Sequence, residues 1–368
     1  MNASIPIKPV KSAPSSVPSP CVVRITAAPK AGVIHWTMPW GYTINILPPC
    51  FNSCVGLAPW TVPLNWPPKR SPALRVLAIP GRQVQRVVNA FGRQAAAWMH
   101  TRPSETRPAP VEVLNIQTDM TGIPARPEEL AGIAGKQPDG SAKTRQIKVG
   151  CVFTQSRDDQ GRPQRDPFSS TYLAAFADPT DFGSLLWSEA LKRGYATARK
   201  TVFLGDGAEW IWNLVSDRFK DAVQIVDFYH ACEHLQALCQ ALESNEQRAK
   251  ALFKSWRKRL KNNGLPRILH EAAARLPALN SMAREAVEDQ LPYFQTNATR
   301  MTYRSFRRQG YFIGSGAIEG ACRHIVAQRT KLSGMRWLCS GAQNVLAFRC
   351  LIKSNLFDAY CESYRPAA

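Results

Sequence analysis

Acidic residues are missing from the first 104 positions of the sequence, because the first carboxylate is that of Glu105. The whole chain has 27 acidic against 47 basic residues and a net charge of +20. Such an excess of positive charge is typical of proteins that neutralise phosphates, so we expect nucleic acid as the partner. A basic surface that is merely solvated is the alternative. A protein of the membrane surface is disfavoured, since no long basic helix with a continuous apolar face stands out.

Long hydrophobic runs and paired cysteines are also missing. No stretch approaches the roughly 20 apolar residues that cross a bilayer, and the first residues, MNASIPIKPVKSAPSS, lack the apolar core of a signal peptide. The ten cysteines show no C-x-x-C spacing, which argues against a disulfide framework; Cys50 and Cys54 lack the second pair that a zinc finger needs. We therefore expect a globular, cytoplasmic protein associated with the nucleoid, with most cysteines free and buried.

Residues 1–78 form a basic segment rich in proline, with runs such as SAPSSVPSP and LNWPPKRSP. Proline blocks helix interiors and central strands, so this segment is expected to be poorly ordered. It is read either as a basic arm or as a truncated or frame-shifted remnant. Residues 79–108 follow as a helix, with apolar residues at helical spacing, and a linker.

Residues 109–232 combine strand and helix patterns. Three strands are predicted first, at 111–119, 145–155 and 171–178, with a turn at 157–167. A helix at about 183–198, a strand at 200–206, a second helix and a strand at 222–228 follow. This order predicts an α/β fold with the RNase H-like core, a mixed five-stranded sheet with helices. An all-helical insertion at 233–310 and a C-terminal part of the core at 311–368 complete the prediction.

Three carboxylates lie where such a core places acids. Asp119 and Asp206 are at predicted strand ends, and Glu319 is one turn into a predicted helix that Ser315 can cap. Carboxylates on rigid elements are the hard oxygen ligands that Mg²⁺ requires. Spacing alone does not distinguish such a triad from caps and ion-pair partners among 27 acidic residues.

The strings around these acids are distinctive. QTDMTGIP, GDGAEWIWNLVSDRF with DFYHACEHL, and GSGAIEGACRHIVAQRTKLSGMRW with GAQNVLAFRCLIKSN resemble the ISKra family of insertion-sequence transposases, which is related to the Mutator-like group. The resemblance runs from about residue 80 to the end. It implies a DDE triad of Asp119, Asp206 and Glu319, holding two Mg²⁺ or Mn²⁺ ions that cleave and rejoin DNA at the terminal inverted repeats of the element. It further implies a homo-oligomer assembled on DNA, and a near-site motif with Asp227 and His230.

Two rival interpretations use the same residues. His230, Glu233 and His234 spell H-x-x-E-H, which on a helix is an inverted zinc-peptidase motif, although no third ligand is apparent. The chain is alternatively a DNA-binding transposase remnant that no longer cleaves.

Basic and aromatic residues near the last acid are the predicted DNA contacts. The arginines of RMTYRSFRRQGYF can bind phosphates while its rings either stack on bases or belong to the core. Arg323 lies one turn after Glu319, to which it can alternatively form an ion pair. One of Trp210 and Trp212 is expected to be buried against the sheet. The predicted DNA-binding residues are Arg304, Arg307, Arg308, Arg323, Arg329, Lys331 and Arg336.

Overall fold

The computed structural model describes residues 23–28, 31–37, 43–46, 81–103, 111–131 and 144–363, the first three ranges by their backbone alone. Those three ranges form an antiparallel sheet of β1 (Val23–Ala28), β2 (Ala31–Thr37) and β3 (Thr43–Ile46). This differs from the expectation for residues 1–78, because these runs lack proline and are rich in β-branched residues. The remainder of that segment, with Cys50 and Cys54, lies outside the described residues.

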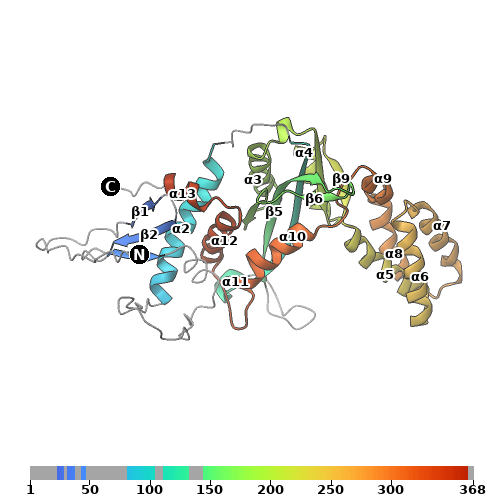
Figure 1. The fold of residues 1–368 in the computed structure, drawn as a ribbon. Helices are drawn as coiled ribbons and strands as arrows, with labels where there is room; N and C mark the ends of the chain where they lie inside the picture. Colours follow the sequence, from blue (N-terminus) through green and yellow to red (C-terminus); the bar gives the residue numbers. More distant parts are fainter. Residues whose placement is uncertain are drawn as a thin grey trace, which may run out of the picture.

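A mixed open sheet of six strands forms the centre of the molecule (Figure 1). Its order is β6-β5-β4-β8-β9, with β7 also paired to β5. The β4–β5 pair and the pairs of β5 with β6 and β7 are antiparallel, whereas β4, β8 and β9 run parallel. The α/β class is as predicted, and the sheet is compatible with an RNase H-like core. The strands are β4 Val113–Pro124, β5 Thr144–Arg157, β6 Pro163–Arg165, β7 Thr171–Ala175, β8 Lys200–Gly205 and β9 Val223–Val226.

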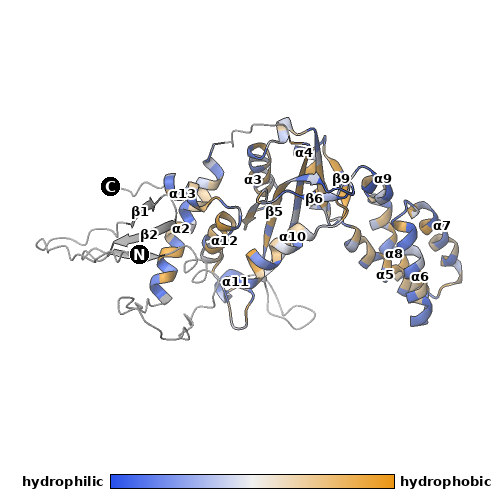
Figure 2. Cartoon of the chain, in the orientation of Figure 1, coloured by the Kyte–Doolittle hydropathy of each residue, from blue (hydrophilic) through white to orange (hydrophobic). Residues whose placement is uncertain are grey.

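Helices cover both faces of this sheet. Successive residues of a strand point to opposite faces of the sheet. On β5, Val152 therefore belongs to one core cluster, together with Leu114 and Ile116 of β4, whereas Val149 and Cys151 belong to the other. The first cluster includes residues of α3 (Pro179–Lys192), α4 (Glu209–Arg218) and the helices that follow β9. The second includes residues of α2 (Gly81–Thr101), α10 (Gly316–Ala321), α12 (Cys339–Lys353) and α13 (Phe357–Ser363). Figure 2 shows apolar colour concentrated on the strands and on the helix sides that face them.

All described elements between β9 and α10 are helical, as the sequence pattern predicts, and the first helix begins at Phe228 instead of near 233. The helices are α5 Phe228–Leu242, α6 Glu246–Leu260, α7 Leu265–Arg275, α8 Ser281–Thr296 and α9 Tyr303–Arg308. They lie at the end of the sheet opposite to α2 (Figure 1). Short elements complete the chain: η1 Pro127–Leu130, η2 Tyr195–Thr197, η3 Leu276–Ala278, η4 Ala298–Met301 and α11 Gln328–Thr330.

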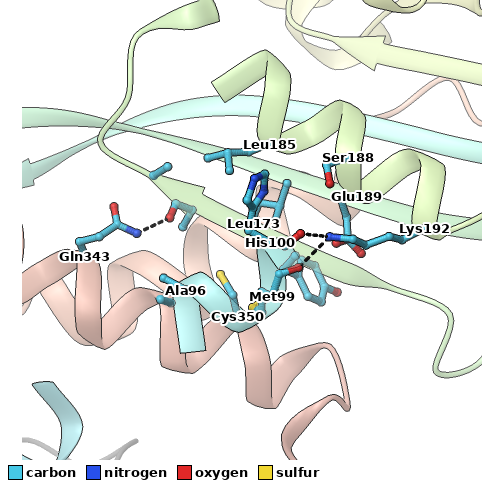
Figure 3. Close-up of a pocket in the computed structure, with 14 residues that line it drawn as sticks. Ala96, Met99, His100, Leu173, Leu185, Ser188, Glu189, Lys192, Gln343 and Cys350 are labelled. Carbon is cyan, nitrogen blue, oxygen red and sulfur yellow. Dashed lines mark hydrogen bonds between the residues drawn. The ribbon is translucent and has the colours of Figure 1, made fainter. Parts of the chain in front are cut away.

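Buried charges join α2 to α3. Arg102 forms an ion pair of 2.8 Å with Glu189, and Lys192 Nζ donates to the carbonyl oxygens of Met99 and His100 at the end of α2 (Figure 3). These bonds satisfy carbonyls that the helix end leaves without a partner. Within the part of the chain that the structure describes, no helix is both long and apolar enough to span a bilayer.

Candidate active site

Asp119 and Asp206 come from two neighbouring parallel strands. The last paired positions of β4 and β8 are Gln117 and Leu204, and each aspartate follows two residues later. Extending the register therefore places the two aspartates opposite each other, where adjacent chains run about 4.8 Å apart. Asp206 directly follows β8, so its predicted place at a strand end is confirmed. The prediction that Asp119 ends its strand is wrong, because β4 continues to Pro124 by pairing with β5.

The two aspartates interact electrostatically. Burial is the largest effect on the pKa of the Asp119 carboxyl and raises it, and repulsion by the Asp206 carboxylate raises it as well. A 2.6 Å hydrogen bond from the Met120 amide is the second largest effect and lowers this pKa, and two smaller effects also lower it: a contact of 3.5 Å from Cys322 Sγ and the charge of His230. A cation placed here would relieve the repulsion between the two acids.

Glu319 approaches from a helix instead of a strand. Its helix, α10, is tied to β4 by the amide of Ile318, which donates to Gln117 Oε1 at 3.1 Å. Gln117 and Asp119 share one face of β4, so α10 lies on the face that bears Asp119. Burial is the main cause that raises the pKa of the Cys322 thiol; the Asp119 carboxylate, which Cys322 contacts, raises it as well, and the Glu319 carboxylate does so to a smaller extent. Glu319 therefore lies near Asp119, on the face of β4 that bears this aspartate.

The Glu319 side chain is exposed and already has a partner. Ser315 Oγ donates to Glu319 Oε1 at 2.8 Å. Ser315 occupies the N-cap position of α10, as predicted, but its side chain makes no cap bond to the helix amides. No group of three or more His, Cys, Asp or Glu side chains among the described residues is arranged to hold a metal ion. The acids therefore converge without forming a preassembled three-carboxylate site.

Asp227 fixes the elements around the acids. Its side chain is 1% exposed, and Oδ1 accepts a 2.6 Å hydrogen bond from the His230 amide at the start of α5. Oδ2 accepts from the amide of Ser315, the residue that precedes α10. One carboxylate thus joins the end of β9 to the helix that carries Glu319, so Asp227 is a structural residue beside the site.

The H-x-x-E-H motif occupies the first turns of α5. The His230 and His234 rings are 5.6 Å apart, and His230 Nδ1 lies 3.3 Å from Glu233. His234 Nδ1 contacts Gln290 Oε1 at 2.9 Å. This nitrogen already has a side-chain partner, which is unfavourable for a zinc site that uses it.

Tyr293 is a site residue that the sequence did not reveal. From α8, its hydroxyl donates to the Asp206 carbonyl oxygen at 2.9 Å, and its ring packs on Gly207 and stacks on His234 with centroids 3.7 Å apart. Gly207 has φ +106°, and a Cβ there would come within 2.6 Å of the Tyr293 ring. A glycine directly after Asp206 was the one available signal of this close approach.

The predicted DNA-binding residues differ in their surroundings. Six of them are exposed on two separate elements, and Arg329 is half-buried. Lys331 Nζ donates to Thr121 Oγ1 at 2.6 Å, two residues from Asp119 on the same strand. The exposed residues are Arg304, Arg307 and Arg308 on α9, and Arg323, Lys331 and Arg336 around and after α11.

The neighbouring aromatic residues are core. Tyr303, Phe306 and Tyr311 are all buried, so they do not stack on bases. Trp212 is buried, as expected for one of the two tryptophans, and Trp210 packs against Phe182. The prediction for Arg304, Arg307 and Arg308 stays a prediction, and these three side chains are exposed.

Comparison with known proteins adds no relative. No protein-family model matches the chain, and no curated protein matches it.

Proposed function

We propose that this chain is a DNA transposase of the DDE type, with an RNase H-like catalytic domain interrupted by an all-helical insertion. The observation that carries the proposal is the pair of aspartates at opposite positions, two residues beyond the last paired residues of two adjacent parallel strands, with Glu319 on a helix packed over β4. Two carboxylates that repel each other in a partly buried place favour a bound divalent cation. The strong positive charge of the chain supports DNA as the substrate.

The donor set fits magnesium or manganese at two of the three acids. Asp119 and Asp206 offer hard carboxylate oxygens on rigid strands, and each has an oxygen that accepts no backbone hydrogen bond within the described chain. Glu319 has to leave Ser315 to join them. Two bound ions would supply Lewis-acid activation of the scissile phosphodiester and of the attacking hydroxyl, for strand cleavage and then for strand transfer.

The residues of the chain hold and orient the DNA. Lys331, which is fixed to β4 beside Asp119, is placed to bind a phosphate next to the scissile bond. Arg323 is exposed one turn beyond Glu319 and can contact the same strand. Arg304, Arg307 and Arg308 offer a second contact on α9. We further propose that the protein acts as a homo-oligomer on the element ends, in the cytoplasm at the nucleoid.

The test is strand cleavage by the full-length protein on DNA that carries the sequences flanking its gene, with Mg²⁺ or Mn²⁺. Asp206→Asn should lower the cleavage rate at least about 1,000-fold, because a lost metal ligand costs several kcal/mol of transition-state stabilisation. DNA affinity should be unchanged or raised, since a repelling charge is removed.

The matched control is Asp178→Asn, since Asp178 also lies between a strand and a helix but caps α3 away from the site. It should retain cleavage. Equal cleavage by wild type and Asp206→Asn contradicts the assignment of the acids, and a wild type that binds DNA without cleaving it indicates the DNA-binding remnant.

A further inference from the structure

A basic groove lies on the helical segment. It has a volume of about 290 Å³ and is lined by Phe228, Phe253, Lys254, Arg257, Lys258 and Lys261. Four of these six residues are cationic and none is acidic. The cations recur at intervals of three, one and three residues along α6 and its end, which places them on one face of the helix. Figure 2 shows the outer part of α6 coloured as hydrophilic.

The charges of this groove lack ion-pair partners. On the same helix and its neighbour, Lys250 pairs with Glu246, and Arg259 pairs with Glu271. The four cations of the groove form no ion pair with any residue in the described ranges. Four like charges gathered in one place repel one another, so a bound polyanion would stabilise the arrangement.

The floor of the groove holds two of the cations in place. The Arg257 guanidinium lies 5.5 Å and Lys261 Nζ lies 5.8 Å from the centroid of the buried Phe228 ring. Such cation–π contacts are attractive, so they orient the charges. Lys254 and Lys258 are exposed at the rim. The groove is therefore ordered at its floor and adaptable at its rim.

The groove begins next to Asp227, the residue that joins the elements around the acids. Phe228 directly follows Asp227, whose carboxylate binds the Ser315 amide before the helix of Glu319. Tyr229, 59% exposed, packs against Gly314 between the two. From Lys254 to Lys261 the helix rises about 10 Å, over which one DNA strand advances about three nucleotides. A strand that leaves the acids along α5 would thus meet several cations in succession.

We propose that this basic groove binds the sugar–phosphate backbone of a DNA strand that flanks the cleavage position. The inference rests on the proposed function for the choice of DNA, but not on cleavage. The groove offers charge without base-reading amides or exposed rings, so it binds phosphates irrespective of sequence. It gives α6 a role in substrate binding, in addition to that of the arginines on α9.

The experiment compares two double variants of the full-length protein that lose the same charge. Lys254→Gln with Lys258→Gln changes the rim of the groove, and Arg248→Gln with Lys250→Gln changes exposed residues of the same helix outside it. Fluorescence anisotropy measures the affinity for a labelled DNA duplex and its single strand at several NaCl concentrations, without divalent metal. Thermal unfolding checks that both variants fold as the wild type does.

The groove variant should bind more weakly, and the slope of log affinity against log salt should fall by about 1.8 on the duplex or about 1.4 on the single strand, the values for two lost phosphate contacts. The control should keep the wild-type slope. Equal slopes for the two variants overturn the proposal. If the groove variant lowers the slope but the wild type never cleaves DNA, the groove proposal stands and the transposase proposal fails. If the wild type cleaves DNA but the groove variant keeps the wild-type slope, the transposase proposal stands and the groove proposal fails.

Discussion

The strand side and the helix side of the acid cluster are built differently. Asp119 and Asp206 are placed by a parallel register that continuous backbone hydrogen bonds fix, and neither can move far without breaking the sheet. Glu319 stands on a six-residue helix followed by a π-helix, with its carboxylate bonded to a nearby serine. The sheet thus positions two acids before any metal binds, whereas the Glu319 carboxylate has to break its hydrogen bond with Ser315 to join them.

The largest effect, a loss of cleavage, is expected from Glu319→Gln, which tests whether the helix side supplies the third metal ligand. If the helix side completes the metal site, the variant should lose cleavage at least about 100-fold while its DNA affinity stays unchanged, because a metal ligand contributes several kcal/mol. The measurement is single-turnover cleavage under saturating DNA.

Two further variants serve as controls for Glu319→Gln. Ser315→Ala removes the hydroxyl that holds Glu319 and should retain cleavage, since it costs no ligand. Glu233→Gln neutralises an exposed glutamate on α5 and should have no effect. Full cleavage by Glu319→Gln would assign the third ligand to another residue.

An intermediate effect, on stability, is expected from Asp227→Asn, which removes one of the hydrogen bonds that join the strand side to the helix side. An asparagine accepts only one of the two backbone hydrogen bonds and leaves a buried amide without a partner, so the free energy of unfolding should fall by about 1–3 kcal/mol. Urea unfolding measures the loss. Wild-type stability would show that the contact with the Ser315 amide contributes nothing.

The smallest change in stability is expected from Asp119→Asn, which tests the strand side of the comparison. Because burial raises the pKa of folded Asp119 above its unfolded value, the protonated acid is favoured in the fold, and this contribution is lost as pH rises through the folded pKa. The variant should therefore be slightly more stable than the wild type at pH 7.

The pH dependence provides the control for this variant. The difference in unfolding free energy should vanish below about pH 4, the usual range of an unfolded aspartate. Added Mg²⁺ should stabilise the wild type and not the variant. A variant less stable than the wild type at pH 7 would contradict the repulsion between Asp119 and Asp206.

The sequence predicted the strand side better than the helix side. The strand at 200–206 and its final aspartate could be located because a short apolar run ends abruptly in GDG, and the observed strand is Lys200–Gly205. The strand of Asp119 was cut short because TDMTGIP is polar and contains glycine, but cross-strand pairing with β5 continues through it. The local sequence pattern does not show which strand will pair with it, so the full length of β4 could not be predicted.

The helix side depends on contacts between distant residues. An ordinary helix was predicted around Glu319, and the π-helix at Cys322–Ala327 was not foreseen. Buried Arg349 of α12 donates to the carbonyl oxygens of His324 and Ile325 within it. Nor could Tyr293 be connected to Asp206, since the two residues are 87 positions apart.

The π-helix after Glu319 has a geometrical consequence. A π turn contains about one residue more than an α turn, so Cys322–Ala327 holds one surplus residue. That residue sets the direction in which Glu319 leaves the helix axis, because removing it would turn the preceding segment by about 100° relative to the one that follows. Deletion of a single residue from Cys322–Ala327 should therefore rotate Glu319 away from Asp119 while α12 stays packed on the sheet.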